Sequence, residues 1–101
     1  MRVDVERVDG GVQIKIAGSI HRGDQQTFLD LADQLDADPA DRCVFDLAGL
    51  DDLDGVGMGM LLFLYETTLA SGKTVNVRGL RDQVARIFAH SPMGPILARR
   101  S

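Results

Sequence analysis

The chain of 101 residues contains a single cysteine, two histidines and no long apolar run. An internal disulfide is therefore excluded, and the apolar neighbours of Cys43 predict a small buried side chain. A zinc site is also unsupported, because neither His21 nor His90 has a cysteine or a second histidine at ligand spacing. The longest apolar run, 58–65, is far shorter than the roughly 20 residues that a helix needs to cross a bilayer.

The N-terminus also lacks the apolar segment of a secretory signal, because residues 1–4 already mix charged with apolar side chains. The formal net charge of −4 disfavours binding to nucleic acid and to anionic membrane surfaces. We therefore expect a cytoplasmic protein with protein partners, without membrane insertion and without a cofactor. Its composition of 45% hydrophobic and 26% charged residues suits one globular domain over residues 1–101, with no need for a structural metal.

Alternation of apolar and charged residues predicts two strands at the N-terminus. The first contains Val3, Val5 and Val8, and the second runs through residues 12–16. Between them, residues 9–11 read Asp-Gly-Gly, which favours a tight turn. The two strands are therefore predicted to form a hairpin.

Helical and extended patterns then alternate along the chain. Asp24 precedes apolar residues at helical spacing and is the expected N-cap or first-turn acid of a helix that closes at residues 36–39. Two strand-helix-strand units follow from the whole order, and they require a partly parallel sheet. The later elements are a central strand at 42–47 buried on both faces, an acidic loop, a deeply buried helix at 58–69, a strand at 74–77 and a third helix around 84–88.

Residues 45–62 resemble the signature of STAS domains. In that pattern a strand ends in D-L-S-G-V, and after two or three residues D-S-S/A-G-L-G-x-L-L opens a helix. Segments 16–20, 72–77 and 83–88 are similar to the second strand, the fourth strand and the third helix of the family. The resemblance implies an α/β fold, a mixed sheet of four to five strands with helices packed mainly on one face. The signature positions are Asp46, Leu47, Gly49, Asp54, Gly57, Gly59, Leu61 and Leu62.

The resemblance implies a non-enzymatic bacterial signalling module of the anti-sigma factor antagonist type, acting in transcription regulation. Such domains dock a GHKL-type serine kinase and anti-sigma factor, and phosphorylation of a Ser or Thr at the start of the second helix switches binding. A helix N-terminus stabilises the added phosphate through its free N–H groups and dipole. Matching Asp54 to the signature aspartate places Gly55 and Val56 at the usual hydroxyl positions, and Thr27 is the one hydroxyl residue between 20 and 63. Docking without this switch is therefore expected.

The docking surface that the resemblance implies combines the loop after the second strand with the start of the second helix. His21 stands where many relatives carry an acidic residue, which would change the partner and add pH sensitivity. An alternative within the family is a non-catalytic subunit that stabilises a lipid-transport complex of the ABC type. The expected partner-binding residues are Ser19, Ile20, His21, Arg22, Asp24, Asp54, Gly55, Val56, Gly57, Met58 and Met60.

Acidic residues at 46, 51, 52 and 54 admit a metal site or a small enzyme as a further alternative. Their spacing does not match an EF-hand loop, so helix capping by Asp54 and solvated charge are the preferred interpretation, with no metal or catalytic residue. The neighbouring glycines lack the endings of a dinucleotide fingerprint and of a P-loop. Instead, Gly57 and Gly59 are expected to allow close packing of helix on strand, and Gly55 a special backbone angle.

Overall fold

The structure is a computed structural model that describes residues 1–89 apart from the side chains of residues 82, 83, 87 and 88. His90 and the C-terminal end of the expected domain lie outside the described residues. The N-terminal hairpin forms as predicted, with β1 (Arg2–Val8) antiparallel to β2 (Gly11–Ile20) and Gly10 at a φ of 75° in the turn. Strand β1 is an edge strand that only β2 flanks, and it is mostly exposed.

Two parallel crossovers build the rest of the sheet, as the order of patterns predicts. The strand order is β1-β2-β3-β5, in which β3 runs parallel to both of its neighbours. A single turn of 3₁₀ helix, η1 (Arg22–Asp24), leads from β2 into the first long helix. The remaining elements are α1 (Gln25–Ala37), β3 (Arg42–Asp46), β4 (Leu50–Leu53), α2 (Gly55–Ala70), β5 (Thr74–Arg78) and α3 (Asp82–Ala89).

The alternation of apolar residues misses two segments that meet at one end of the sheet. Strand β2 continues beyond residue 16 to Ile20, in agreement with the resemblance of residues 16–20 to the second strand of STAS domains. The prediction of an acidic loop was wrong, because that loop contains β4, which pairs in parallel with the extension of β2. Gly18 adopts a φ of 86° and donates its N–H to the carbonyl of Gly49 at 2.9 Å. This left-handed residue shifts the register, so that the last residues of β2 pair with β4 instead of β3.

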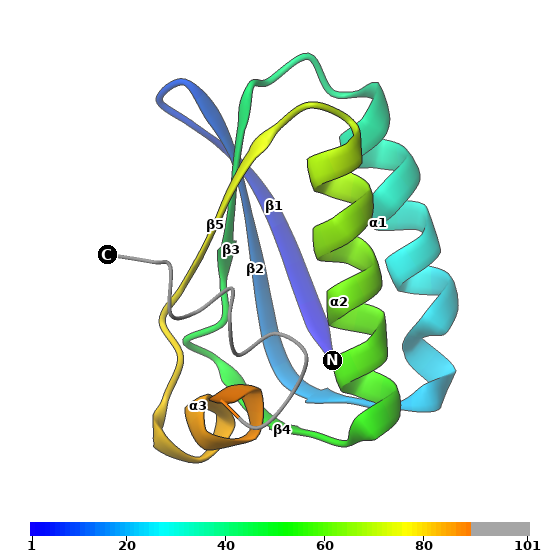
Figure 1. Ribbon diagram of the computed structural model, residues 1–101, viewed down its shortest axis with the longest axis vertical. Coiled ribbons are helices and arrows are strands. Elements are labelled where there is room, and N and C mark those ends of the chain that lie inside the picture. The colour runs from blue at the N-terminus through cyan, green and yellow to red at the C-terminus, as the bar shows by residue number, and fades with distance from the viewer. Residues whose placement is uncertain (90–101) are drawn as a thin grey trace.

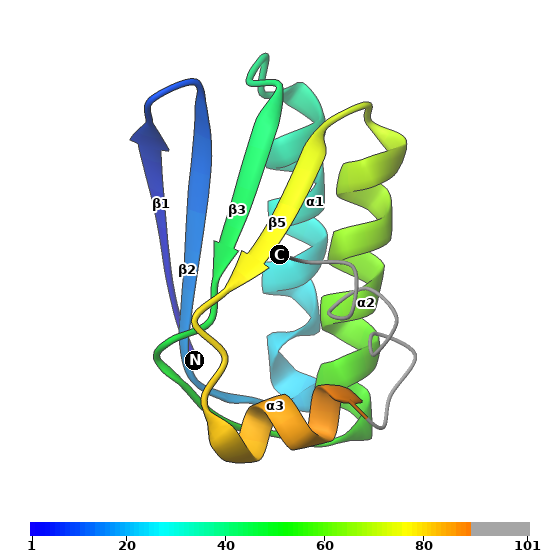
Figure 2. The same ribbon diagram turned by 60° about the vertical axis from the view of Figure 1, so that its left-hand side comes forward.

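Figures 1 and 2 show α1 and α2 side by side on one face of the sheet, with α3 at the end where β4 lies. Because no described helix covers the opposite face, β3 is not buried on both sides as predicted. Cys43 and Phe45 are buried towards the helices, whereas Val44 and Asp46 are half-buried on the other side. Burial also raises the pKa of the Cys43 thiol to about 11, which keeps it protonated.

Helix α2 begins after Asp54 and ends before Gly72, whose left-handed φ of 92° terminates it. It is not buried all round, however, because the sheet and α1 cover only part of its circumference. Leu64 is fully buried, whereas Val56 and Phe63 are exposed on the outer side. None of the helices within residues 1–89 has the length and apolar character needed to cross a bilayer.

A buried lysine joins the C-terminal end of α1 to the start of β5. The Nζ atom of Lys73 donates to the carbonyl oxygens of Asp38 at 2.6 Å and of Ala40 at 2.7 Å. The Asp38 carboxylate accepts the N–H of Ala40 at 2.8 Å and two guanidinium N–H groups of Arg7 at 3.0 and 2.8 Å. The Ala40 N–H, aided by Arg7 and opposed by desolvation, holds the pKa of Asp38 below its ordinary value.

Candidate partner-docking surface

The start of α2 is fixed by Asp54, the residue that the sequence predicts as its cap. Asp54 has extended backbone, and its Oδ1 atom accepts the N–H of Gly57 at 2.8 Å. Its carbonyl oxygen accepts the N–H of Met58 at 2.9 Å, which is the first hydrogen bond of the helix. The carboxylate therefore satisfies one of the N–H groups that a helix leaves free and adds charge of the sign that the helix dipole favours.

The first turn of α2 packs directly on the ends of β2 and β4. A Cβ atom built on Gly57 would lie 3.2 Å from side-chain carbons of Ile20 and of Leu53, which leaves no room for a larger residue without movement. The close packing expected for Gly57 is thus confirmed. The expectations for the other two glycines are wrong, since a Cβ on Gly59 meets nothing within 4 Å and Gly55 has no left-handed φ.

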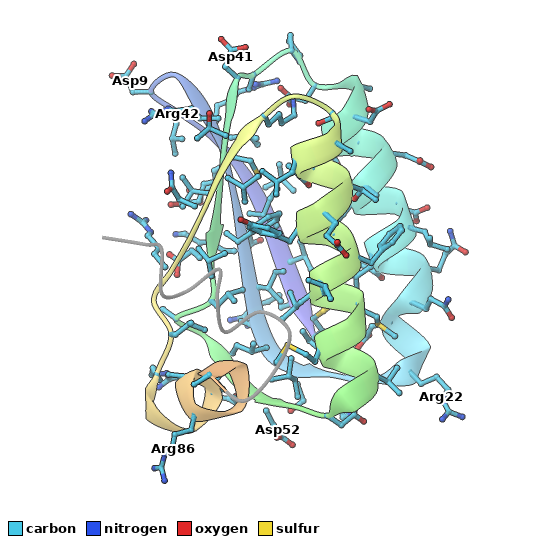
Figure 3. All side chains as sticks on the ribbon, viewed as in Figure 1. Asp9, Arg22, Asp41, Arg42, Asp52 and Arg86 are labelled. Carbon is cyan, nitrogen blue, oxygen red and sulfur yellow. The ribbon has the colours of Figure 1, made fainter. Side chains whose placement is uncertain are left out.

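Two hydrogen bonds between Asp24 and His21 hold the connection from β2 to α1 in a tight turn. The Oδ2 atom of Asp24 accepts the N–H of His21 at 2.7 Å, and the N–H of Asp24 donates to the His21 carbonyl at 2.9 Å. Asp24 occupies the N-cap position of α1, but its side chain makes no capping bond to that helix and holds the 3₁₀ turn instead. Figure 3 shows Arg22 projecting from the N-terminal end of α1, at the same end of the molecule as Asp52.

The structure divides the predicted docking residues into an exposed set and a supporting set. Ile20, Gly57 and Met58 are buried beneath the surface and cannot contact a partner without rearrangement. Met60 is also buried, although it contributes to the floor of a groove described below. Ser19 and Asp24 are half-buried, and the exposed members are His21, Arg22, Asp54, Gly55 and Val56. Because α2 packs on the end of β2, the exposed members share one end of the molecule.

An open apolar groove of about 450 Å³ runs between α1 and α2 next to these residues. Three large apolar side chains at its edges are unusually exposed for their type, with Leu29 at 40%, Val56 at 40% and Phe63 at 38%. Arg22 stands at the end of the groove nearest the N-termini of the two helices. The groove is lined by Arg22, Gln25, Phe28, Leu29, Val56, Gly59, Met60 and Phe63.

The sequence analysis did not identify Gln25, Leu29, Gly59 and Phe63 as surface residues of this groove. The sequence feature that could have indicated an exposed apolar surface is the apolar character of α2 on more than one stripe, which the prediction explains by deep burial. An apolar helix also arises when part of its circumference faces an open surface. The distinction required the position of α1, which no local pattern in α2 contains.

The clustered acidic residues separate into individual local roles. Asp46 accepts the N–H of Ala48 at 3.0 Å, and Asp51 lies 3.3 Å from the guanidinium of Arg81 on the way into α3. With Asp54 engaged in capping, these carboxylates do not converge. Among the described residues, no three Asp, Glu, His or Cys side chains are grouped so that they could hold a metal ion.

Two solved structures of anti-sigma factor antagonists share this fold. The antagonist SpoIIAA in its unphosphorylated form is similar over 93% of this chain and 84% of its own, with a TM-score of 0.76 and 18% identity. An anti-sigma factor antagonist from Mycobacterium paratuberculosis is similar over 88% of this chain and 74% of its own, with a TM-score of 0.69 and 23% identity. At these identities, the two likenesses establish the α/β fold and its mixed sheet.

Part of a longer protein, Mglu, has the same fold, with a TM-score of 0.64 and 26% identity over 74% of this chain. The chain spans only 19% of the length of Mglu. No curated protein matches the chain. Residues 3–97 match the model of a family described as "Mlab, STAS domain". Since that match covers nearly the whole sequence, the chain belongs to the STAS domain family.

Proposed function

We propose that this protein is a non-enzymatic signalling module of the cytoplasm that docks a GHKL-type serine kinase or anti-sigma partner, without a phosphorylation switch at the start of α2. The observation that carries the proposal is Val56, which is exposed in the first turn of α2 and has no hydroxyl group. Membership of the STAS domain family and the likeness to two anti-sigma factor antagonists support the class of partner.

The docking surface is the exposed end formed by the β2 to α1 connection and the start of α2. The hydrogen bonds of Asp24 and Asp54 fix both segments, so little conformational entropy is lost when a partner binds. The contact of Gly57 with Ile20 holds the two segments in register. Exposed Val56 adds apolar area of the kind that the centre of a protein interface buries.

Loss of the switch follows from chemistry at the same position. A phosphate ester needs a hydroxyl oxygen, and Val56 offers only methyl groups. The hydroxyls that precede Val56 in the sequence do not replace it, because Ser19 is half-buried in β2 and Thr27 lies within α1. The nearest hydroxyls after it, on Tyr65, Thr67 and Thr68, lie well beyond the first turn of α2. Without a hydroxyl in the first turn of α2, docking at this surface is constitutive.

The direct test compares the wild-type protein with Val56→Ser in the presence of its cognate kinase and ATP. We expect the wild-type protein to bind the kinase and to gain no phosphate, whereas Val56→Ser gains one phosphate and then binds more weakly. Val5→Ser is the matched control, because Val5 is as exposed as Val56 but lies on β1. Intact-mass analysis and titration calorimetry measure the two quantities.

Stoichiometric phosphate on the wild-type chain near residue 56 would overturn the constitutive part of the proposal. Failure to bind any kinase or anti-sigma factor would overturn the partner class. Recovery of an ABC-type ATPase in native complexes, with no kinase, would instead favour the alternative of a structural subunit in a lipid-transport complex. Val56→Ser also discriminates the signalling module from the structural subunit, because a serine at position 56 should not weaken assembly of a structural subunit that no kinase phosphorylates.

A further inference from the structure

The groove between α1 and α2 has the dimensions of two turns of helix. Val56, Gly59 and Phe63 form one stripe on α2, and the residues from the first to the last span about 10 Å at 1.5 Å per residue. Gln25 and Leu29 form the facing stripe on α1. Both helices connect parallel strands, so they run in the same direction, as Figure 2 shows.

Gly59 creates the hollow in the middle of this groove. Its missing side chain would have pointed into open space, since a Cβ atom there meets nothing within 4 Å. A glycine inside a helix costs about 1 kcal/mol relative to alanine, and nothing in the packing around Gly59 requires that cost. The helix is therefore less stable than it could be at a position where the only structural gain is an open groove.

The two helices that form the groove carry acidic side chains and no basic ones. Helix α1 contains three aspartates, α2 contains one glutamate, and neither contains lysine or arginine. Asp33 and Asp36 continue the stripe of Leu29, and Glu66 continues the stripe of Phe63, all of them exposed. Within residues 1–89 these three carboxylates form no ion pair. Arg22 thus lies at one end of the groove, and the carboxylates of Asp33, Asp36 and Glu66 lie beyond its other end.

We propose that this groove binds an amphipathic helix of the protein partner, with apolar residues at i, i+3 or i+4, and i+7 and with basic residues beyond one end of that stripe. The proposal rests on the proposed function and adds the chemistry of the partner segment. The apolar residues fill the hollow at Gly59 between Val56 and Leu29. The basic residues face Asp33, Asp36 and Glu66, which complement their charge.

The same charges argue against the other occupants of an apolar groove. An anionic lipid surface would be repelled by the carboxylates of Asp33, Asp36 and Glu66 beyond the end of the groove. A second copy of this chain would bring the same acidic helices together, and like charges across an interface are unfavourable. A fatty acid would find one cation, Arg22, but would leave the carboxylates on the outer face of α1 and α2 without a role.

The test is a selection from a display library of helix-forming peptides of about 15–20 residues, with the full chain as the immobilised target. The library varies all positions, so neither the apolar pattern nor the charge is imposed. We expect the enriched peptides to share the i, i+3 or i+4, i+7 apolar pattern together with lysine or arginine at one end. Their affinities are then measured by calorimetry at two salt concentrations.

Gly59→Leu is the decisive variant, because a leucine fills the hollow and also improves the helix. We expect it to melt at or above the wild-type temperature and to weaken peptide binding by at least about tenfold. Asp33→Lys combined with Glu66→Lys should weaken binding by about three- to tenfold and reduce its salt dependence. Leu69→Ala is the matched control, since Leu69 is an exposed apolar residue of α2 outside the groove.

The proposal is overturned if no peptide is enriched, if the enriched peptides lack basic residues, or if Gly59→Leu binds them as tightly as the wild type does. It is also overturned if a fluorescent long-chain fatty acid binds the wild type and is excluded by Gly59→Leu. The peptide selection needs no kinase, so its failure is distinct from failure of the proposed function. Kinase binding that survives Gly59→Leu would refute the groove as the docking site while leaving the proposed function intact.

Discussion

Replacing Asp54 by alanine tests whether the start of α2 is held as the structure shows. The substitution removes the acceptor of the Gly57 N–H, a bond of 2.8 Å, and the charge next to the helix N-terminus. Loss of an N-cap costs about 1 kcal/mol, and loss of the interaction with the helix dipole costs about 0.3–1 kcal/mol. We therefore expect Asp54→Ala to lower the free energy of unfolding by about 1.5 kcal/mol.

For a domain of this size, about 1.5 kcal/mol corresponds to a fall in melting temperature of about 6–12 °C. Asp54→Asn keeps an oxygen acceptor and loses the charge, so it should lose only the smaller electrostatic part of this free energy. Asp52→Ala is the control, because the Asp52 side chain points away from the molecule in Figure 3 and makes no hydrogen bond or ion pair within the described chain. Its melting temperature should change by less than that of either Asp54 variant.

Calorimetry and urea titration measure these differences, and partner titration measures their effect on docking. The reasoning is refuted if Asp54→Ala and Asp52→Ala have the same melting temperature, because the cap would then contribute nothing to stability. If Asp54→Asn loses as much as Asp54→Ala, the charge and not the N–H acceptor is responsible. Where the cap matters, partner affinity should fall more for the alanine variant than for the asparagine variant, since only the former frays the first turn.

Three further predictions concern groups away from the docking surface. Lys73→Met should lower the free energy of unfolding, measured by urea titration, by about 1–3 kcal/mol, because the carbonyls of Asp38 and Ala40 lose their buried donor. Lys15→Met is the control, because Lys15 is exposed, and an equal effect of the two substitutions would contradict the role assigned to Lys73. The folded-state pKa of Asp38 lies below its ordinary value of 3.8, so its contribution to stability is present above that pH and is lost as the pH falls through the lowered pKa. Unfolding curves between pH 6 and about pH 3 should therefore be less acid-sensitive for Asp38→Asn than for the wild type, and parallel pH profiles would refute this. The buried Cys43 thiol should react with a thiol reagent at neutral pH only as fast as the chain opens, so rapid modification of the native protein would contradict its burial.

Local features were readable from the sequence because their causes are local. The hairpin follows from alternation on both sides of Gly10, and the helix start follows from an aspartate before an apolar helical run. The resemblance to STAS domains, carried by residues 45–62, implied the α/β fold and its mixed sheet, which the structure and its likeness to SpoIIAA confirm. The partner surface and the loss of the switch remain predictions.

Where the sequence analysis failed, the cause lay in contacts between distant segments. Strand β4 has too few residues to show a pattern, and it is a strand because the end of β2 pairs with it. The same periodicity could not separate Gly57, which lies against Ile20, from Gly59, which faces open space.

By itself, the sequence determined the hairpin, the long helices, the family and the missing hydroxyl at position 56, since each depends on residue identity and spacing along the chain. The tertiary structure alone decided which apolar residues of α2 are covered. A helix presents its whole circumference to its surroundings, and only the positions of the sheet and of α1 leave Val56 and Phe63 exposed beside a groove. Residue identity therefore sets the chemistry of the proposed docking surface, whereas the packing of α2 against α1 sets its shape.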